Sequence, residues 1–273
     1  MEPYSVLMTV YHGENPEQFH IAIRSILEQT YPTNDFVIVC DGPLTEELDR
    51  VLDTYTREYP EIFNIVRLPE NVGIGGANAE GLKYCKNDLV AKLDADDIAV
   101  SDRCQKQVAC FAQKPELTVL SGLIEEFDQN PEAPFAIRHV PATYPEIRKF
   151  ARRRQPFNNT AVMYRRSAVE AVGSYHYLRR CEDYDLYIRL LHAGFYAENL
   201  QEVLVKVRVD RSACGRRASR ATTKGVVRSR WAAYRLGYSS FLDFLICAVG
   251  QLVVLICPSW LQHRIYNSFL RQH

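Results

Sequence analysis

The sequence predicts an α/β fold built on a mostly parallel sheet with helices on both faces. Short apolar runs typical of buried strands alternate with segments of helical spacing along the first half of the chain. Several of these runs end on acidic or polar residues, as expected where the carboxyl ends of parallel strands form a ligand site. The 273 residues, 47% hydrophobic and 24% charged, suit one large α/β domain or two smaller ones.

The first hundred residues alternate four expected strands with three expected helices. Each strand is a short apolar run, and each helix carries apolar residues every three or four positions. Pro32 ends the first helix, and acidic residues favour the start of the second. Strands are expected at residues 5–10, 36–40, 63–68 and 89–93, and helices at about 19–29, 45–55 and 74–85.

Three carboxylates, Asp94, Asp96 and Asp97, directly follow the fourth strand. Carboxylates so close repel one another, and a divalent cation is the usual reason to hold them together. Asp94 and Asp96 alternate, so on an extended chain they point the same way. A solvated acidic turn is the alternative. The loops at 9–14 and 41–43 are expected at the same sheet edge, and this convergence favours a metal–diphosphate site.

The glycine-rich segment 73–78 must be compared with known phosphate loops. Gly73 and Gly75 match part of a dinucleotide fingerprint, but Asn78 stands at the third glycine position and the segment follows the third strand. The G-K-[ST] ending of a P-loop is absent. We therefore expect a strand-to-helix turn whose glycines adopt positive φ, with close approach to a ligand as a secondary role.

The second half continues the alternation beyond a loop at residues 128–134, which we expect to separate two halves of the fold. A helix that begins near Cys181 carries Glu182 and Asp183 in its first turn. Acidic residues there can cap the helix, and the helix dipole is expected to lower their pKa values and keep them ionised. An ionised carboxylate can also act as a general base, and both roles stay open. Helices are expected at 103–113 and 144–153, a strand at 117–122, and a loop entering a strand at 158–164.

The C-terminal part is basic and then apolar. Ten Lys or Arg residues lie between positions 206 and 235, with Asp210 as the only acid, which suggests a polyanion or an anionic membrane face. The apolar run 244–257 is shorter than the ~20 residues that span a bilayer. An in-plane membrane helix and an ordinary packed helix are both open. The basic, amphipathic character continues at Arg264, Tyr266, Phe269 and Arg271.

Composition also bears on the compartment. The net charge is zero, so nothing global suggests nucleic acid. The eight cysteines form no C-x-x-C, and free thiols in a reducing cytoplasm are expected. The N-terminus lacks a basic region ahead of an apolar run, so no signal peptide is expected.

The chain resembles the family 2 glycosyltransferases of the GT-A fold over roughly residues 4–210. The resemblance is strongest to bacterial enzymes of O-antigen and exopolysaccharide assembly, the amylovoran-type branch. No single motif is specific, but five occur in the family's order and at suitable spacing. These are residues 5–11, Asp41-Gly42, Asn71-Val72-Gly73, Leu93-Asp94-Ala95-Asp96-Asp97 and Glu182-Asp183.

The resemblance implies an inverting transfer of one sugar from a UDP-sugar, glucose or galactose type, to a saccharide on a polyprenyl diphosphate. It implies Mn²⁺ or Mg²⁺ on Asp96, with Asp94 shared between ribose and metal and Asp97 in a supporting role. Asp183 would be the catalytic base, with Glu182 beside it near the acceptor. Nucleotide-sugar contacts would come from Thr9, Val10, Tyr11, Glu14, Asp41 (to the uracil), Asn71 and Ala95, and acceptor contacts from Asn158, Asn159 and Thr160.

The resemblance also implies an organisation of the chain. Residues 1–128 would bind the nucleotide sugar, 129–210 the acceptor, and 211–273 would form a helical tail with possible peripheral attachment to the cytoplasmic face of the inner membrane. Processive synthases of the family carry Q-x-x-R-W. Here Val227 stands where the glutamine is expected before Arg230 and Trp231, which argues for addition of a single sugar.

Two rival functions are weighed against this one. A sugar nucleotidyltransferase shares a doubly wound sheet but needs a glycine-rich loop with arginine after the first strand, and residues 9–15 contain no such loop. A non-catalytic nucleotide-sugar-binding protein at the membrane would not need the full set of acidic residues.

Overall fold

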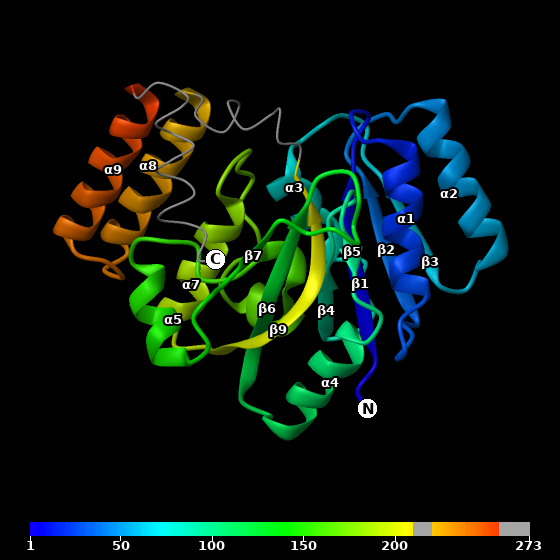
Figure 1. The fold of residues 1–273 in the computed structure, drawn as a ribbon, viewed down its shortest axis with the longest axis horizontal. Helices are drawn as coiled ribbons and strands as arrows, with labels where there is room; N and C mark the ends of the chain where they lie inside the picture. Colours follow the sequence, from blue (N-terminus) through cyan, green and yellow to red (C-terminus); the bar gives the residue numbers. More distant parts are fainter. Residues whose placement is uncertain (210–219, 257–273) are drawn as a thin grey trace.

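The computed structural model describes residues 1–209 and 220–256 (Figure 1). A nine-stranded sheet runs in the order β3-β2-β1-β4-β8-β6-β9-β5, and β7 pairs with β6. The strands are β1 (Tyr4–Val10), β2 (Asp35–Cys40), β3 (Phe63–Arg67), β4 (Leu89–Lys92), β5 (Ile98–Ala99), β6 (Leu117–Phe127), β7 (Ala136–Arg138), β8 (Met163–Arg165) and β9 (Tyr196–Arg208). The helices are α1 (Pro16–Leu27), α2 (Glu46–Glu58), α3 (Ile74–Leu82), α4 (Arg103–Gln113), α5 (Tyr144–Ala151), α6 (Arg166–Ala171), α7 (Glu182–His192), α8 (Arg220–Arg235) and α9 (Phe241–Ile256), with a 3-10 turn η1 (Asn159–Ala161).

The four expected N-terminal strands are confirmed and pair in parallel. β1 lies between β2 and β4, and β3 pairs with β2. Because these strands are parallel, their carboxyl ends meet at one edge of the sheet. The loops that begin at Tyr11, Asp41 and Leu93 therefore start side by side.

The second half of the sheet is mixed. β8 is antiparallel to both β4 and β6, whereas β9 is parallel to β6. β5 and β7 add further antiparallel pairings. The chain passes from the η1 turn, at the carboxyl edge of the sheet, directly into β8. β8 therefore runs away from that edge and is antiparallel to β4.

Helices cover both faces of the sheet, as the sequence predicts. Along β2, Phe36 and Ile38 pack into one core, while Val37 and Val39 pack into another. The first core takes side chains from α1, α2 and α4, and the second from α3, α5, α6 and α7. Strands buried on both faces explain why these runs are continuously apolar rather than alternating.

Local capping sets the start of the first two helices. The Asn15 side chain accepts hydrogen bonds from the backbone N–H groups of Glu17 and Gln18, and Pro16 follows it. The Thr45 hydroxyl accepts from Leu48 N at 3.4 Å. Such caps satisfy backbone donors that the helix itself leaves unpaired.

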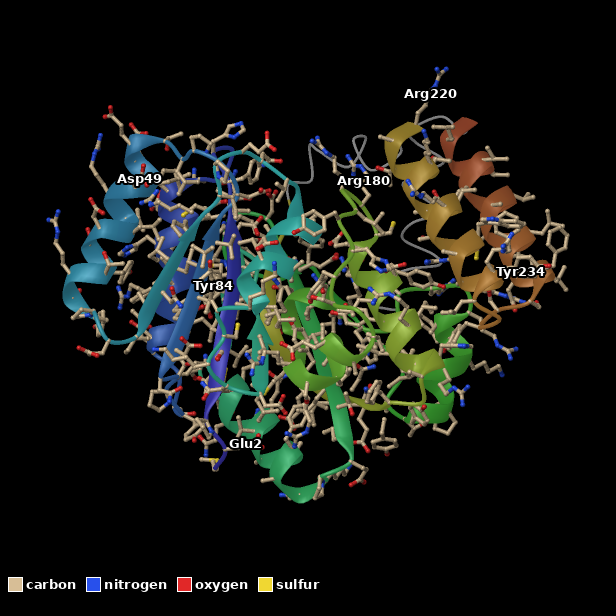
Figure 2. The ribbon with its side chains drawn as sticks, turned by 180° about the vertical axis from the view of Figure 1, so that it is seen from behind. Glu2, Asp49, Tyr84, Arg180, Arg220 and Tyr234 are labelled. Carbon is tan, nitrogen blue, oxygen red and sulfur yellow. The ribbon has the colours of Figure 1, made fainter. Side chains whose placement is uncertain are left out.

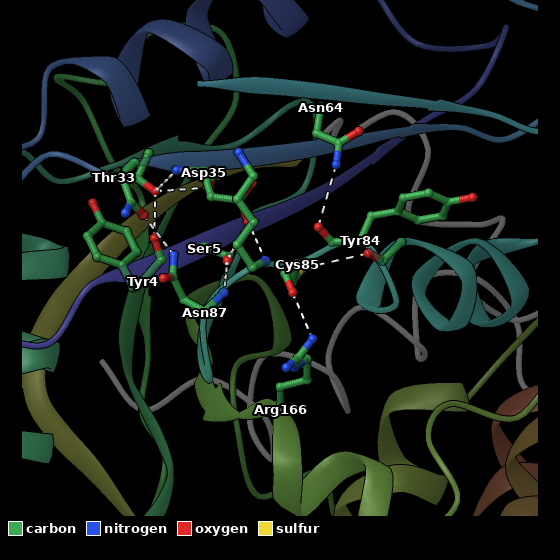
Figure 3. A network of polar contacts seen from close by, with 12 residues as sticks. Tyr4, Ser5, Thr33, Asp35, Asn64, Tyr84, Cys85, Asn87 and Arg166 are labelled. Carbon is green, nitrogen blue, oxygen red and sulfur yellow. Dashed lines mark hydrogen bonds and ion pairs between the residues drawn. The ribbon is translucent and has the colours of Figure 1, made fainter. Parts of the chain in front are cut away.

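A buried polar network holds the edge opposite the strand carboxyl ends (Figure 3). The Ser5 hydroxyl donates to Asp35 Oδ2 at 2.6 Å, and the backbone N–H of Lys86 donates to the same oxygen at 2.8 Å. Asn87 N donates to Ser5 Oγ at 3.0 Å. Because these contacts join the starts of β1 and β2 to the segment ahead of β4, they fix how far each strand reaches at its other end.

The C-terminal helices form a hairpin at the side of the molecule, beside α5 and α7 (Figure 1). Asp243 of α9 is buried and pairs with Arg153, with 2.6 Å between Oδ1 and Nε. In the described part of the chain, no helix is both long and apolar enough to cross a bilayer. The expected basic residues Arg211, Arg216 and Arg217, and the continuation at 264–271, lie outside the described residues.

Candidate active site

A cavity of about 1300 Å³ opens at the carboxyl edge of the parallel strands. Loops that follow β1, β2, β3 and β4 contribute to its wall, so residues far apart in sequence meet there. The expected nucleotide-sugar and metal residues that line it are Thr9, Val10, Tyr11, Glu14, Asp41, Asn71, Asp94, Ala95 and Asp96.

The three carboxylates of the acidic loop have different surroundings. Asp97 is buried, accepts a hydrogen bond from Arg208 N at 3.1 Å and bonds to the Thr160 hydroxyl. Asp94 and Asp96 line the cavity. The Asp94 Oδ1 atom is buried and has no hydrogen-bond partner among the described residues. The geometry thus separates one carboxylate that braces the loop from two that face the cavity.

Burial and mutual repulsion disfavour ionisation of this cluster. Burial raises the pKa of Asp94, and burial together with the charge of Asp94 raises the pKa of Asp96 to about 6. Burial and the same two charges raise the pKa of Glu14 to about 7. A positive ligand would offset this repulsion.

Two buried basic side chains, Lys92 and Arg103, form hydrogen bonds around the end of β4, just ahead of the acidic loop. Lys92, at the end of β4, donates from Nζ to Asn78 Oδ1 at 2.5 Å. Arg103 donates from Nη2 to the backbone carbonyls of Lys92 and Val162, at 2.7 and 3.2 Å. Its Nε donates to Gln107, which in turn donates to carbonyls of β6 and η1. These contacts tie the end of β4 to the segment expected on the acceptor side.

Asp41 organises the turn after β2 and the glycine-rich segment together. Its Oδ1 accepts from Val72 N at 2.7 Å and its Oδ2 from Gly73 N at 3.1 Å, while Asn71 Nδ2 donates to its backbone carbonyl. Each carboxylate oxygen has two lone pairs, so Asp41 can still accept from a ligand N–H. Gly73 has φ +85°, as expected for the turn, but Gly75 and Gly76 lie inside α3 and do not adopt the positive φ expected of them.

The other glycines of this segment serve packing. A Cβ on Gly75 would lie 2.4 Å from the carbonyl oxygen of His176, and one on Gly76 would lie 2.8 Å from the Tyr177 ring. Gly75 and Gly76 therefore allow close approach of the segment ahead of α7, whereas Gly73 lines the cavity. Sequence spacing could not reveal this contact, because the partner lies a hundred residues away.

Glu182 and Asp183 begin α7, and their pKa values correct our expectation. Burial, followed by the charge of Asp183, raises the pKa of Glu182 to about 8, and burial raises the pKa of Asp183. The expected lowering by the helix dipole was wrong, because loss of hydration outweighs a partial charge at a helix end. Neither side chain forms an N-cap hydrogen bond to the first turn of α7. Asp183 Oδ1 accepts a hydrogen bond from the adjacent Tyr184 N, at 2.7 Å.

The expected acceptor segment lies between Asp183 and the acidic loop. Gln155 Nε2 donates to Asp183 Oδ2 at 2.5 Å, and the Tyr187 hydroxyl donates to Asn159 Oδ1 at 2.6 Å. The Thr160 hydroxyl accepts from Asp94 N at 3.1 Å. The charge of Asp94 also contributes to the raised pKa of Asp183. The candidate base and the acidic loop therefore belong to one electrostatic unit.

Comparison with known proteins decides the family. The model described as Glycosyl transferase family 2 matches residues 5–173. The chain is a family 2 glycosyltransferase.

Two of the relatives of this glycosyltransferase cover nearly its whole length, and a third covers three quarters of it. It is 38% identical over 269 residues to an uncharacterised glycosyltransferase of Haemophilus influenzae, which covers 98% of this chain and 99% of that protein. It is 31% identical over 269 residues to the UDP-Gal:alpha-D-GlcNAc-diphosphoundecaprenol beta-1,3-galactosyltransferase of Escherichia coli, covering 98% and 97%. The amylovoran biosynthesis glycosyltransferase AmsE of Erwinia amylovora is 34% identical over 205 residues, covering 75% and 76%.

Solved structures confirm the GT-A fold of the glycosyltransferase. Mannosyltransferase PcManGT of Pyrobaculum calidifontis, in complex with GDP-Man and Mn²⁺, superposes with a TM-score of 0.68 at 16% identity, covering 98% of this chain and 79% of that one. Residues 1–349 of S. aureus TarS, in complex with UDP-GlcNAc, give 0.69 at 15% identity, covering 97% and 79%.

The donor set in the glycosyltransferase fits a hard divalent cation. Within residues 1–209 and 220–256, no group of three or more His, Cys, Asp or Glu side chains could hold a metal ion. Asp94 has an unpartnered buried oxygen, and Asp96 lines the same cavity. Mg²⁺-type sites commonly use one or two carboxylates and take their other ligands from substrate phosphates and water. The two aspartates match that pattern.

Sequence reasoning missed the basic wall of the cavity. Arg179 and Arg180, ahead of α7, and Lys224 and Arg228, on α8, all line it. Figure 2 places Arg180 close to the upper end of α8, and a Cβ on Gly225 would lie 3.1 Å from the Arg180 Cβ. The local excess of positive charge indicated a polyanion, but only the packing of α8 on α7 shows where that anion would lie.

Proposed function

We propose that this glycosyltransferase moves one sugar from a UDP-sugar, of glucose or galactose type, to a saccharide on a polyprenyl diphosphate carrier. The observation that carries the proposal is the single cavity in which three strand-end loops, the Asp94–Asp96 pair and four cations meet. The E. coli relative, matched over almost its full length, uses UDP-Gal and a lipid-diphosphate acceptor according to its name. A nucleoside diphosphate sugar has a base, a ribose and a diphosphate to fill such a cavity, and the name of the E. coli relative favours UDP as the nucleotide.

In this proposal the donor lies across the carboxyl edge of the sheet. Thr9, Val10 and Tyr11 line the nucleoside end, and Asp41 accepts from the uracil N–H. Asp94 contacts the ribose, with Glu14, Asn71 and Ala95 close by. The cations Arg179, Arg180, Lys224 and Arg228 face the diphosphate, since arginine and lysine are the side chains that pair with phosphate oxygens.

Asp96, with Asp94, would hold Mn²⁺ or Mg²⁺. A bound cation would supply electrostatic stabilisation of the charge that develops on the leaving diphosphate. The Mn²⁺ in the Pyrobaculum mannosyltransferase supports use of a divalent ion by this fold. Asp97 supports the loop through its bonds to Arg208 N and Thr160.

Asp183 would act as the general base. The acceptor hydroxyl oxygen attacks the anomeric carbon as the bond from that carbon to the diphosphate oxygen breaks, and Asp183 takes the hydroxyl proton. Attack from the face opposite the leaving UDP inverts the anomeric configuration. Gln155 orients the carboxylate, Glu182 lies beside it, and Asn158, Asn159 and Thr160 border the acceptor.

The helical hairpin would hold the enzyme at the cytoplasmic face of the inner membrane, where a lipid-linked acceptor lies. Support comes from the exposed apolar side chains of α9, among them Leu242, Leu245 and Val249. Arg220 and Arg235 of α8 add positive charge that favours an anionic surface.

A donor panel tests the function. UDP-glucose, UDP-galactose and their N-acetyl forms are incubated with a synthetic GlcNAc-diphosphate-lipid, with and without EDTA, and the glycosylated lipid and free UDP are measured. We expect product with at least one donor, loss of product in EDTA, and no product with Asp183→Asn. UDP-sugar binding without release of UDP would support a binding protein instead. Pyrophosphate release from UTP and a sugar phosphate would support a nucleotidyltransferase.

A further inference from the structure

A second cavity of about 1200 Å³ lies next to the acceptor segment, separate from the nucleotide cavity. We call it the basic cavity, because Arg138, Lys149, Arg152, Arg153 and Arg154 line it. Most of these residues come from α5 and the loop that follows it. Gln155 and Asn158 lie on its wall as well. The basic cavity thus touches the expected acceptor side, and its five cations have no role in the function described above.

The charge of the basic cavity is poorly neutralised by its own walls. Two acidic side chains line it, and both are engaged: Glu146 accepts from the Thr143 N–H and hydroxyl, and Asp243 pairs with Arg153. Arg138 pairs with Glu126. Neither Lys149 nor Arg152 forms an ion pair with a described residue, and both are exposed. Lys149 and Arg152 therefore supply positive charge without matching acids on a concave wall, which suits an anionic ligand.

One short segment connects the basic cavity to the catalytic carboxylates. Gln155 lines the cavity and donates to Asp183 at 2.5 Å. Its Oε1 is buried and has no hydrogen-bond partner among the described residues, so it can accept from a ligand hydroxyl. Asn158 lines the cavity two residues before Thr160, whose hydroxyl contacts Asp94 N. A ligand in the basic cavity would therefore contact Gln155, the residue that is hydrogen-bonded to the candidate base.

We propose that the basic cavity binds the diphosphate of the lipid-linked acceptor. The proposal rests on the proposed function for the identity of that acceptor. In a sugar diphosphate the phosphate is bonded to the sugar ring that carries the reacting hydroxyl, so only one ring separates the two. A diphosphate held by Lys149 and Arg152 places that ring beside Gln155 and Asp183. Arginine pairs with phosphate oxygens through two parallel N–H bonds, which fixes orientation as well as affinity.

The donor does not need this cavity. The nucleotide cavity has its own four cations, Arg179, Arg180, Lys224 and Arg228. Two cavities that share no lining residue, each with its own cations, match a reaction in which donor and acceptor each carry a diphosphate.

The test compares two acceptors on the full-length enzyme: GlcNAc on a short-chain alkyl diphosphate, and the same sugar as a neutral alkyl glycoside. We expect the wild type to prefer the diphosphate acceptor in kcat/KM. Lys149→Ala and Arg152→Ala should each lower the ratio of the two kcat/KM values by roughly tenfold, as for loss of one charge-assisted hydrogen bond. The KM for the UDP-sugar should stay unchanged.

Arg148→Ala is the matched control. Arg148 is an exposed cation of the same helix, its guanidinium lies over the Tyr144 ring at 5.7 Å, and it does not line the basic cavity. The control should keep the wild-type ratio. Equal ratios for Lys149→Ala, Arg152→Ala and wild type would overturn the proposal.

Direct binding separates this proposal from the proposed function. Geranyl diphosphate, which carries no sugar, is titrated into the wild type and Arg152→Ala, and phosphatidylglycerol vesicles are titrated in parallel. Weaker binding of geranyl diphosphate to the variant supports the diphosphate site even if no donor in the panel is transferred. Weaker vesicle binding with unchanged geranyl diphosphate binding would mean that these cations contact membrane headgroups, and would overturn the proposal.

Discussion

At the scale of the residue, the site is a cluster of acids that resist ionisation. Asp94, Asp96 and Glu14 share one cavity, and Glu182 and Asp183 lie close enough for the charge of Asp94 to raise their pKa values. Such a cluster is unfavourable in an empty protein and becomes favourable when a cation or a substrate proton neutralises it. Perturbed carboxylates in a cleft are typical of functional sites.

Asp96→Ala should weaken binding of the divalent cation and leave the nucleotide pocket itself intact. We expect transfer to fall by roughly a hundredfold or more, because the charge on the leaving diphosphate loses its stabilisation. Calorimetry with Mn²⁺ present should show that the variant binds UDP more weakly than the wild type does. With EDTA in place of Mn²⁺, the two proteins should bind UDP equally. Asp53→Ala, at an exposed position of α2, is the control. Wild-type turnover by Asp96→Ala would refute its assignment as the metal ligand.

The acid limb of the pH–rate profile should report the Glu182–Asp183 pair. Transfer requires ionised Asp183, and burial raises its pKa, so activity should fall on acidification at a higher pH than an ordinary carboxylate predicts. The charge of Asp183 contributes to the pKa of about 8 at Glu182, so Asp183 ionises first and Glu182 is still protonated along the acid limb. Glu182→Gln imitates that neutral side chain and should leave the limb near its wild-type position. Profiles of kcat/KM are measured for both and for Glu47→Gln, an exposed control. A limb that moves to lower pH in Glu182→Gln would mean that Glu182 is already charged when Asp183 titrates, and would contradict this order of ionisation.

The raised pKa of Glu182 also makes the stability of the fold depend on pH. The folded-state pKa of Glu182, about 8, exceeds its ordinary value of 4.5, so folding favours the protonated form. The stability that this group contributes is therefore present at low pH and decreases as pH rises toward about 8.

At the scale of the element, α3 shows how a turn predicted for a ligand also serves packing. The helix begins at Ile74 after Gly73 and carries Gly75 and Gly76 in its first turn. Their missing side chains let the chain ahead of α7 lie directly on the helix. Glu182 and Asp183 follow that chain segment, so the glycines help to fix where α7 begins.

Gly75→Ala should destabilise the protein by roughly 1–3 kcal/mol, because the new Cβ would meet backbone oxygens of His176 and Leu178 at 2.4 and 2.7 Å. Gly250→Ala is the comparison, since it lies in α9 with nothing within 4 Å of its Cβ. That variant should be roughly 0.5–1 kcal/mol more stable than wild type, through helix propensity. Urea unfolding measures both, and equal stabilities would contradict the packing role.

At the scale of the whole molecule, the helical hairpin combines two surfaces. The Lys224 side of α8 faces the nucleotide cavity, whereas α9 exposes a row of large apolar side chains. Asp243 and Arg153 join α9 to the loop after α5. A membrane contact through α9 would therefore keep the loop after α5, which lines the basic cavity, near the same surface.

Leu245→Glu should weaken membrane binding without disturbing the fold. Leu245 is 44% exposed, so the new charge can stay hydrated in solution but would have to be desolvated in a bilayer interface. Co-sedimentation with phosphatidylglycerol vesicles should fall several-fold, while thermal unfolding should match the wild type. Thr54→Glu, at an exposed position of α2, should leave vesicle binding intact. Unchanged binding by Leu245→Glu would mean that α9 is purely structural.

The sequence by itself determined the four parallel strands, the order of the motifs and the strand ends where the site would form. These features depend on local periodicity and on the rule that parallel strands share a carboxyl edge. Element ends were less predictable: α3 ends at Leu82 rather than near Cys85, and β6 extends to Phe127, five residues past its expected end.

Only the tertiary structure decided how the side chains of the site are held. The raised pKa values of Glu182 and Asp183, the contact between Gly75 and His176, and the place of Lys224 in the nucleotide cavity all reversed or extended the expectations. Each depends on burial or on contacts between residues far apart in the chain. Periodicity and spacing contain neither quantity, because hydration is lost only when distant elements pack together.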